Sequence, residues 1–241
     1  MDERPGGAAN VARNIAELGA HCTLLSVVGA DEAGDCLLRL LTGRGRIEAL
    51  LQRDESISTI VKLRAIARQQ QLLRIDFETQ PSHEVLQAKL ADFRRKLQDC
   101  DVVLLSDYGK GGLTHIAEMI RLARAAGKPV LVDPKGDDYE RYRGATLLTP
   151  NRSEFRDVAG NWKDEAELGI KAQKLRQDLG LEALLVTRSE EGMSLFRERE
   201  VLHEPTRARE VYDVSGAGDT VIATLAVMLA SGAGLDDAVR I

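Results

Sequence analysis

Cysteine is scarce in this chain, and its three cysteines (Cys22, Cys36 and Cys100) are far apart. An odd number of widely spaced cysteines among apolar neighbours excludes a disulfide framework. We therefore predict reduced core thiols in a cytoplasmic protein. The four histidines are scattered, and none stands at a zinc-like spacing from a cysteine or from another histidine.

Other features are also missing. The net charge is −5 and no dense basic patch is present, which argues against nucleic acid as a partner. No apolar run reaches the length of a membrane span and no signal peptide is recognisable, so we expect no membrane partner. Internal repeats and low-complexity linkers are absent too. With 44% hydrophobic residues, the chain can bury one large α/β core, with or without a small appended element.

Strands and helices alternate along most of the chain. The pattern predicts an opening helix, strand and helix over 8–18, 22–28 and 33–41. Further helices are expected over 84–98, 114–126 and 165–179, with a short one capped by Ser153. Further strands are expected over 102–106, 130–132, 146–148, 183–186, 193–196 and 210–212. Repeated β-α-β units with apolar strands indicate an α/β fold, in which a mostly parallel sheet carries helices on both faces.

Residues 43–78 differ from the rest of the chain in their pattern of apolar and polar residues. Residues 57–64 and 72–77 alternate in part between apolar and polar side chains, on either side of the polar run Arg68-Gln69-Gln70-Gln71. Such half-alternating strands favour a small, partly exposed sheet outside the main core.

Polar side chains collect where the parallel strands end. These residues are Asp107 and Lys110, Asp133 and Lys135, Asn151 and Glu154, and Thr187 and Arg188. In open α/β sheets, ligands bind outside the carboxyl ends of the strands. The sequence therefore predicts a ligand site at this edge.

A glycine-rich turn, Asp213-Val214-Ser215-Gly216-Ala217-Gly218-Asp219-Thr220, opens the apolar run 221–230. The free backbone N–H groups at the start of such a helix, together with its dipole, form a site for an anion such as phosphate. A carboxylate in that first turn suits a general base that takes a proton from a hydroxyl. The alternative is that Asp219 only caps a buried helix.

Three motifs together resemble the ribokinase-like (PfkB) carbohydrate kinases. They are Gly6-Gly7-Ala8-Ala9-Asn10-Val11-Ala12 with the later Gly19 and Gly29, the segment Asn151-Arg152-Ser153-Glu154, and the turn from Asp213 to Asp219. The resemblance implies a Rossmann-like kinase with a small β lid at 43–78, which often pairs into homodimers. It also implies phosphoryl transfer from ATP with Mg²⁺ to an alcohol group of a sugar.

Within this family, the chain most resembles the heptose 7-phosphate kinases. The segments that carry this are Glu3 to Val11, Gln70-Gln71-Leu72, Ser106-Asp107-Tyr108, Tyr142 to Asn151 and Leu185 to Glu190. The resemblance implies phosphorylation of the anomeric hydroxyl of D-glycero-β-D-manno-heptose 7-phosphate to the 1,7-bisphosphate, in ADP-heptose and lipopolysaccharide core synthesis.

The resemblance also implies roles for individual residues. Asp219 would be the catalytic base, and the backbone N–H groups of Gly216, Ala217 and Gly218 the anion hole. Asn151 and Glu154 would organise Mg²⁺, while Thr187 and Arg188 would approach the ATP phosphates. Gly6, Gly7 and Asn10 would form the sugar-binding turn, with Asp107 and the lid residue Gln70 also at the substrate. The cations proposed for the 7-phosphate are Lys110, Lys135 and Arg68; each lysine could equally be a solvated loop residue.

Two alternatives stay open from the sequence. One is another sugar or sugar-phosphate kinase of this family, acting on fructose or ribose. The other is a non-catalytic nucleotide- or sugar-binding domain, against which Asp219 and Glu154 argue. A dinucleotide-binding dehydrogenase is disfavoured because no Gly-x-Gly-x-x-Gly follows an early strand. We expect residues 1–241 to be one kinase domain shortened at both ends, without the family's first strand and last helices; a fused second domain is possible.

Overall fold

The computed structural model describes residues 3–43, 45–67, 70–206 and 216–241, with only the backbone at 65–67, 70, 71 and 74. Its helices are α1 (Ala8–Glu17), α2 (Glu32–Thr42), α3 (His83–Lys96), α4 (Ile116–Ala125), α5 (Arg152–Ala159), α6 (Glu165–Asp178), α7 (Ala217–Ala230) and α8 (Leu235–Val239). Its strands are β1 (Cys22–Gly29), β2 (Ile47–Asp54), β3 (Val61–Ala67), β4 (Gln70–Phe77), β5 (Val103–Ser106), β6 (Val130–Asp133), β7 (Leu147–Leu148), β8 (Ala183–Thr187), β9 (Met193–Phe196) and β10 (Val201–Glu204).

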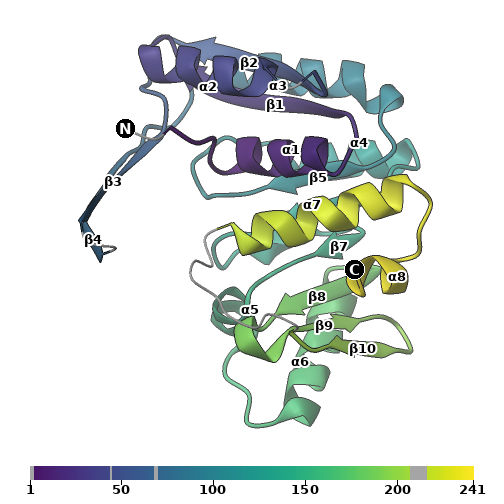
Figure 1. The fold of residues 1–241 in the computed structure, drawn as a ribbon. Coiled ribbons are helices and arrows are strands. Elements are labelled where there is room, and N and C mark those ends of the chain that lie inside the picture. Colours follow the sequence, from purple (N-terminus) through teal and green to yellow (C-terminus); the bar gives the residue numbers. More distant parts are fainter. Residues whose placement is uncertain (1–2, 44, 68–69, 207–215) are drawn as a thin grey trace.

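The largest sheet has six strands in the order β10-β9-β8-β7-β6-β5 (Figure 1). Strands β5 to β8 run parallel to one another, and β9 and β10 add an antiparallel edge. The predicted α/β class with a mostly parallel sheet is confirmed. Because β5 to β8 are parallel, their carboxyl ends meet at one edge, as the strand-end argument requires.

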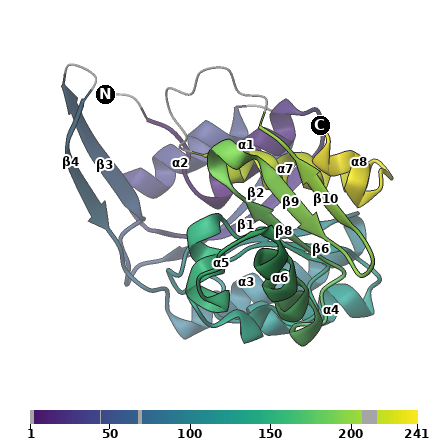
Figure 2. The same cartoon turned by 90° about the horizontal axis from the view of Figure 1, so that it is seen from below.

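Helices cover both faces of this sheet because its strands are apolar on both sides. Val130 and Val132 of β6 pack into one cluster with residues of α3, α4, α5 and α6. Leu131, between them, packs into a second cluster with α1, α7 and α8. Successive side chains of a strand point to opposite faces, so a run of apolar residues needs cover on each. Figure 2 shows the two helical layers on either side of the sheet.

Strands β1 and β2 form a separate parallel pair. The sequence did not predict β2, which lies inside the 43–78 stretch and belongs with β1 and α2. Among the described strands, β1 pairs only with β2, and β5 pairs only with β6, so each has one open edge. A cavity of about 2190 Å³ is lined by the consecutive residues 22–28 and 102–105, among others. Since consecutive strand residues alternate between faces, this cavity runs along the two open edges.

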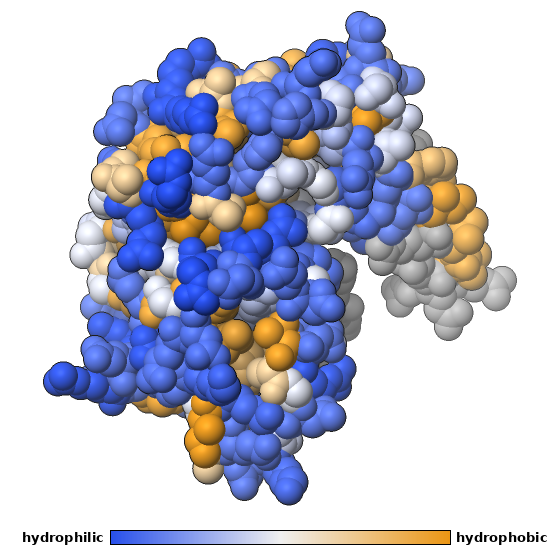
Figure 3. All heavy atoms as spheres, turned by 180° about the vertical axis from the view of Figure 1, so that it is seen from behind, coloured by the Kyte–Doolittle hydropathy of each residue, from blue (hydrophilic) through white to orange (hydrophobic). Residues whose placement is uncertain are grey.

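Strands β3 and β4 pair antiparallel as a hairpin that projects from the body (Figure 1). The register places Val61 opposite Phe77 and Leu63 opposite Ile75. These residues and Leu73 share one face of the hairpin, and the exposed fraction is 52% for Phe77 and 40% for Leu63. Apolar side chains gather on this arm in Figure 3. The hairpin therefore carries an exposed apolar face.

Several sequence predictions need correction. Ser153 does not cap α5; the N-cap is Asn151, two residues earlier. The edge strand β10 was not predicted, and the expected strand 210–212 lies outside the described residues. The three thiols are free and only partly buried; Cys22 and Cys100 pack against the core clusters, whereas Cys36 belongs to none of them. Among the described helices, none combines the length and the apolar character that crossing a membrane would need.

Candidate active site

Asp219 lies in the first turn of α7, where two distant segments reach it. The Asn10 amide Nδ2 donates to Oδ2 of Asp219 over 2.6 Å. The Tyr108 hydroxyl donates to Oδ1 over 2.8 Å. Asn10 comes from α1 and Tyr108 from the loop after β5. Both oxygens of the candidate base are thus held by neutral donors.

Two glycines make this convergence possible. Gly216, the N-cap of α7, has φ 82°, and a Cβ atom there would lie 3.1 Å from Nδ2 of Asn10. Gly7, the N-cap of α1, has φ 55°, and a Cβ atom there would lie 3.2 Å from the Tyr108 ring. Both backbones are left-handed and both have a side chain against them, which only glycine combines without strain. Gly6 precedes this turn in the same cleft.

The start of α7 offers backbone donors to a ligand. Ala217 and Gly218 are exposed and are the first two residues of the helix. N–H groups at these positions lack intrahelical partners, and they lie beside Asp219. A carboxylate and backbone donors able to bind an anion therefore lie next to each other at one helix N-terminus.

The buried side chain of Asp107, which is 5% exposed, holds the loop after β5 in place through hydrogen bonds. Its Oδ1 accepts the Gly109 N–H over 2.8 Å, and its Oδ2 accepts the Tyr142 hydroxyl over 2.9 Å. Lys89 of α3 donates its ammonium to the Gly112 carbonyl further along the loop. Burial lowers the pKa of this lysine to about 8. Asp107 thus braces the loop, and contact with a substrate stays a prediction.

Asn151 and Glu154 form a reciprocal cap at the start of α5. The Asn151 side chain accepts the Glu154 N–H over 3.0 Å, and Glu154 accepts the Asn151 N–H over 3.0 Å. The second oxygen of Glu154 pairs with Lys135 over 2.9 Å. Burial, and then the charges of Glu154 and Asp219, raise the pKa of Asp133 to about 7. Negative charge is therefore crowded at the ends of β6 and β7.

The crowding bears on Mg²⁺, the predicted cofactor. Within the part of the chain that the structure describes, no three His, Cys, Asp or Glu side chains converge closely enough to hold a metal ion. However, Mg²⁺ usually takes one or two carboxylates and keeps its waters. The carboxylates of Asp133 and Glu154 repel each other, and they fit a magnesium ion that is held by two carboxylates and keeps several waters.

Thr187 and Arg188 end β8 beside Asn151. Thr187 donates its N–H to Pro150 over 3.0 Å and forms a bridge with Asn151. Arg188 is 5% exposed. Its guanidinium is shared between Glu165, at 2.8 Å, and Glu191, with which it also pairs. This arginine is neutralised by two carboxylates, and its contact with ATP stays a prediction.

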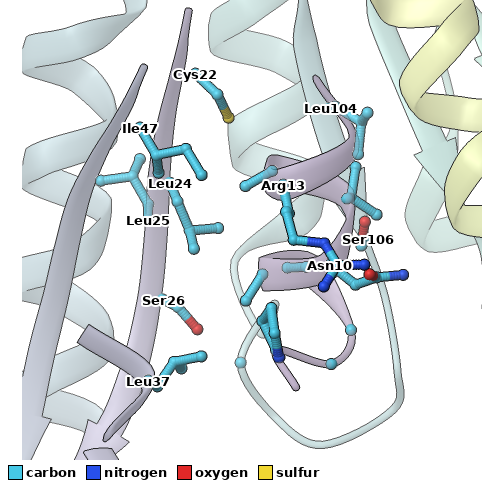
Figure 4. Close-up of a pocket in the computed structure, with 18 of the residues that line it drawn as sticks. Asn10, Arg13, Cys22, Leu24, Leu25, Ser26, Leu37, Ile47, Leu104 and Ser106 are labelled. Carbon is cyan, nitrogen blue, oxygen red and sulfur yellow. The ribbon is translucent and has the colours of Figure 1, made fainter. Parts of the chain in front are cut away.

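The large cavity reaches the candidate base. Besides β1 and β5, it is lined by Gly6, Gly7, Asn10, Tyr108, Lys110 and Asp219. Figure 4 shows Leu24 and Ser26 on one side of the cavity, and Asn10, Leu104 and Ser106 on the other. Lys110 pairs with Glu78, at the foot of the hairpin. Of the predicted lid residues, Arg68 lies outside the described residues, and only the backbone of Gln70 is described, in β4.

Sequence reasoning assigned no individual role to Tyr108 and Lys89, and it counted Asp133 only among the polar residues at the strand ends. Asp133 directly follows a predicted strand and Tyr108 lies two residues after another, which was a usable signal. Lys89 lies inside a polar amphipathic helix and gives no signal, since only the packing of α3 buries it.

Comparison with known proteins extends these observations. The family model described as "pfkB family carbohydrate kinase" matches residues 1–241. The chain belongs to the pfkB family of carbohydrate kinases.

Relatives agree over nearly the whole chain. It is 55% identical over 239 residues to the D-beta-D-heptose 7-phosphate kinase of Bordetella bronchiseptica, covering 99% of this chain and 76% of that one. It is also 55% identical over 240 residues to the bifunctional protein HldE of Aeromonas hydrophila, covering 99% of this chain and 50% of that one. The chain thus spans about half the length of such bifunctional relatives.

Solved structures share the fold. Phosphofructokinase-2 of Escherichia coli superposes with a TM-score of 0.81 at 18% identity, covering 100% of this chain and 79% of that one. Arabidopsis thaliana ribokinase, complexed with ribose and ATP, gives a TM-score of 0.75 at 20% identity, covering 98% and 78%. The fold is ribokinase-like. As a pfkB kinase domain the chain is a phosphotransferase with an alcohol group as acceptor, and ATP is the donor that the family implies.

Proposed function

We propose that this pfkB kinase transfers the γ-phosphoryl group of ATP to the anomeric hydroxyl of D-glycero-β-D-manno-heptose 7-phosphate. The product, the 1,7-bisphosphate, serves ADP-heptose and lipopolysaccharide core synthesis in the cytoplasm. The observation that carries the reaction type is Asp219, held by two neutral donors beside the free N–H groups of α7. The 55% identity to a heptose 7-phosphate kinase supports the acceptor.

In this reaction Asp219 takes the proton of the acceptor hydroxyl as the oxygen attacks phosphorus. The N–H groups of Gly216, Ala217 and Gly218 receive the charge that spreads over the oxygens of the transferring group. Phosphoryl transfer depends mainly on positioning and electrostatic stabilisation, and a helix N-terminus supplies both. A binding module would need no base at this position.

Glu154 and Asn151 are the residues we propose for holding Mg²⁺, with Asp133 beside them. When bound, the ion would neutralise charge on the ATP phosphates and orient them. Burial, and then repulsion from Glu154 and Asp219, raises the pKa of Asp133 to about 7, and this crowding of carboxylates supports a cation there. Thr187 and Arg188 flank this region, and we propose them for the phosphate chain of ATP.

The acceptor would lie in the cleft lined by Gly6, Gly7 and Asn10. Asp107 would support the binding of the acceptor indirectly, by holding the loop after β5 in place. Of the cations proposed for the 7-phosphate, Lys110 lines the cleft, and Lys135 lies at the metal side, paired with Glu154. Lys110 is therefore the stronger candidate, since it lines the cleft proposed for the acceptor and Lys135 does not. Arg68 and Gln70 are proposed to complete the contact.

The β3–β4 hairpin is proposed as a lid that closes over the acceptor and excludes water. Residues 60–64 at its base line the cleft, which supports this role. Its apolar face would be buried against the same face of a second copy, making a homodimer. An apolar patch on an extended arm favours a dimer, because monomeric soluble proteins rarely leave such a patch exposed to solvent.

The test is ADP release by the full-length protein with Mg²⁺–ATP. Heptose 7-phosphate, fructose 6-phosphate, fructose and ribose are offered in parallel. We expect a clear preference for heptose 7-phosphate in kcat/KM. Preference for another sugar would refute the acceptor while keeping the kinase. Absence of turnover with all four sugars, alongside ATP binding, would contradict the proposed reaction and favour a binding domain.

A further inference from the structure

The carboxylate of Asp219 is held at both ends. Oδ2 accepts from Asn10 over 2.6 Å and Oδ1 accepts from Tyr108 over 2.8 Å. The terminal torsion of an aspartate is intrinsically broad, so two donors on different oxygens fix the plane of the carboxylate. We propose that Tyr108 is a positioning residue for the transfer step, and that its hydroxyl orients Asp219 toward the acceptor. This inference rests on the proposed role of Asp219 as the base.

Tyr108 is itself fixed in place. Its ring packs against Gly7, where even a methyl group would lie within 3.2 Å of it. The residues on either side are tied together, because Asp107 accepts the Gly109 N–H over 2.8 Å. Lys89 holds the far end of the loop at Gly112. A side chain supported this way can orient its partner without rearranging, which is what a productive site requires.

The hydroxyl of Tyr108 acts as a donor and not as a second base. Burial, and then the charge of Asp219, raises the pKa of Tyr108, so the phenol keeps its proton throughout the working pH range. Each carboxylate oxygen can accept more than one hydrogen bond. Oδ1 and Oδ2 therefore retain capacity for the acceptor hydroxyl while Tyr108 and Asn10 stay bound.

The first test is Tyr108→Phe in the full-length protein, with Tyr139→Phe as the matched control. Tyr139 is 2% exposed, and its hydroxyl has no hydrogen-bond partner among the described residues. Both changes remove one phenolic oxygen and leave the ring in place. We expect Tyr108→Phe to lower kcat about 100-fold, since small misplacements of a reacting group cost this much. KM for ATP and for the sugar should stay within about threefold, and Tyr139→Phe should match the wild type. A rise in the sugar KM with kcat unchanged would overturn the proposal.

The second test asks whether Tyr108 works through Asp219. Residues that act as one unit give non-additive losses. In the Asp219→Asn background, Tyr108→Phe is therefore expected to lower the remaining kcat by less than about twofold. Independent losses that multiply in the double variant would mean that Tyr108 acts elsewhere, and the proposal would fail.

A third readout needs no turnover and separates this inference from the proposed function. A tyrosine that donates to a carboxylate has a perturbed near-ultraviolet absorbance. The difference spectrum between wild type and Asp219→Asn should show a tyrosine band, and the same comparison in the Tyr108→Phe background should not. The same band in both backgrounds would refute the contact even if the sugar kinase activity is confirmed. If no sugar is phosphorylated, this spectrum still decides whether Tyr108 donates to Asp219.

Discussion

At the scale of single residues, the site is built by pairs that are far apart in sequence. Asn10 and Asp219 are separated by 209 positions and share a hydrogen bond. Neither residue alone distinguishes a base from a helix cap. Their contact supports the proposed base, because it brings the turn proposed for the sugar against the helix N-terminus proposed for the phosphoryl group.

Replacing Asp219 tests the base directly. Asp219→Asn keeps the shape of the side chain but removes its charge and cannot accept a proton. We expect kcat to fall at least about 100-fold, the usual contribution of a general base, while ATP binding measured by calorimetry is retained. Near-wild-type turnover would contradict the assignment.

Lys89 should make stability depend on pH in a defined direction. Its ordinary pKa is 10.5 and burial lowers it to about 8 in the folded chain. Below pH 8 both states carry the proton. Between the two values the unfolded chain binds the extra proton, so the free energy of unfolding rises with pH.

Lys89→Met removes this titration. Relative to that variant, the wild type should gain up to roughly 3 kcal/mol between about pH 7.5 and pH 10.5, from the 1.36 kcal/mol per pKa unit. Urea unfolding of both proteins at each pH measures the difference, and effects shared by the two proteins cancel. A difference that stays constant with pH would show that the lysine is not buried as described.

At the scale of elements, α5 combines a structural and a chemical task at its first turn. Asn151 caps the helix and Glu154 completes the capping box. Glu154→Gln can still accept the backbone N–H but loses its charge. We expect this variant to keep its stability within about 0.5 kcal/mol, because the Lys135 partner is half exposed and surface pairs contribute little.

The Mg²⁺ concentration for half-maximal rate should rise in Glu154→Gln. Asn151→Ala is the counterpart: loss of the cap should lower the free energy of unfolding by about 1 kcal/mol. Denaturant titration and Mg²⁺ titration of both variants separate the two tasks. An unchanged Mg²⁺ requirement in Glu154→Gln would remove it from the metal site.

Elements with strong local periodicity were predictable, and their partners were not. The apolar runs of β6 and β8 and the glycine after α1 define these elements by themselves. Strand β2 was missed because Ile47-Glu48-Ala49-Leu50-Leu51 neither alternates nor forms a uniform apolar run, and its pairing with β1 is set by the tertiary fold. The cap of α5 was misplaced although Asn151 and Glu154 already have capping-box spacing. The motifs name the residues of the proposed site, whereas the contact between Tyr108 and Asp219 needed coordinates.

At the scale of the whole molecule, the hairpin should decide the oligomeric state. Ile75 shares the apolar face with Leu63 and Phe77, whereas Lys62, which is also exposed, belongs to the opposite face by strand alternation. We expect Ile75→Lys to convert the proposed homodimer into a monomer in sedimentation experiments. Lys62→Glu, a change of charge on the other face, should leave the dimer intact. A dimer in both variants would place the interface elsewhere.

The open edges of β1 and β5 have a consequence for how the sheet exchanges hydrogen with solvent. Alternate backbone amides of these strands point into the cavity instead of to a neighbouring strand, whereas β6 is paired on both sides. In deuterated water, we expect cavity-facing amides of β1 to exchange much faster than those of β6, although both strands carry buried side chains. Equal protection of every β1 amide would mean that the cavity closes in solution. Fast exchange would show that side chains, and not backbone hydrogen bonds, hold the two sheets together at these edges. An extended segment that supplied backbone partners to both β1 and β5 would then stabilise the fold by joining the two sheets.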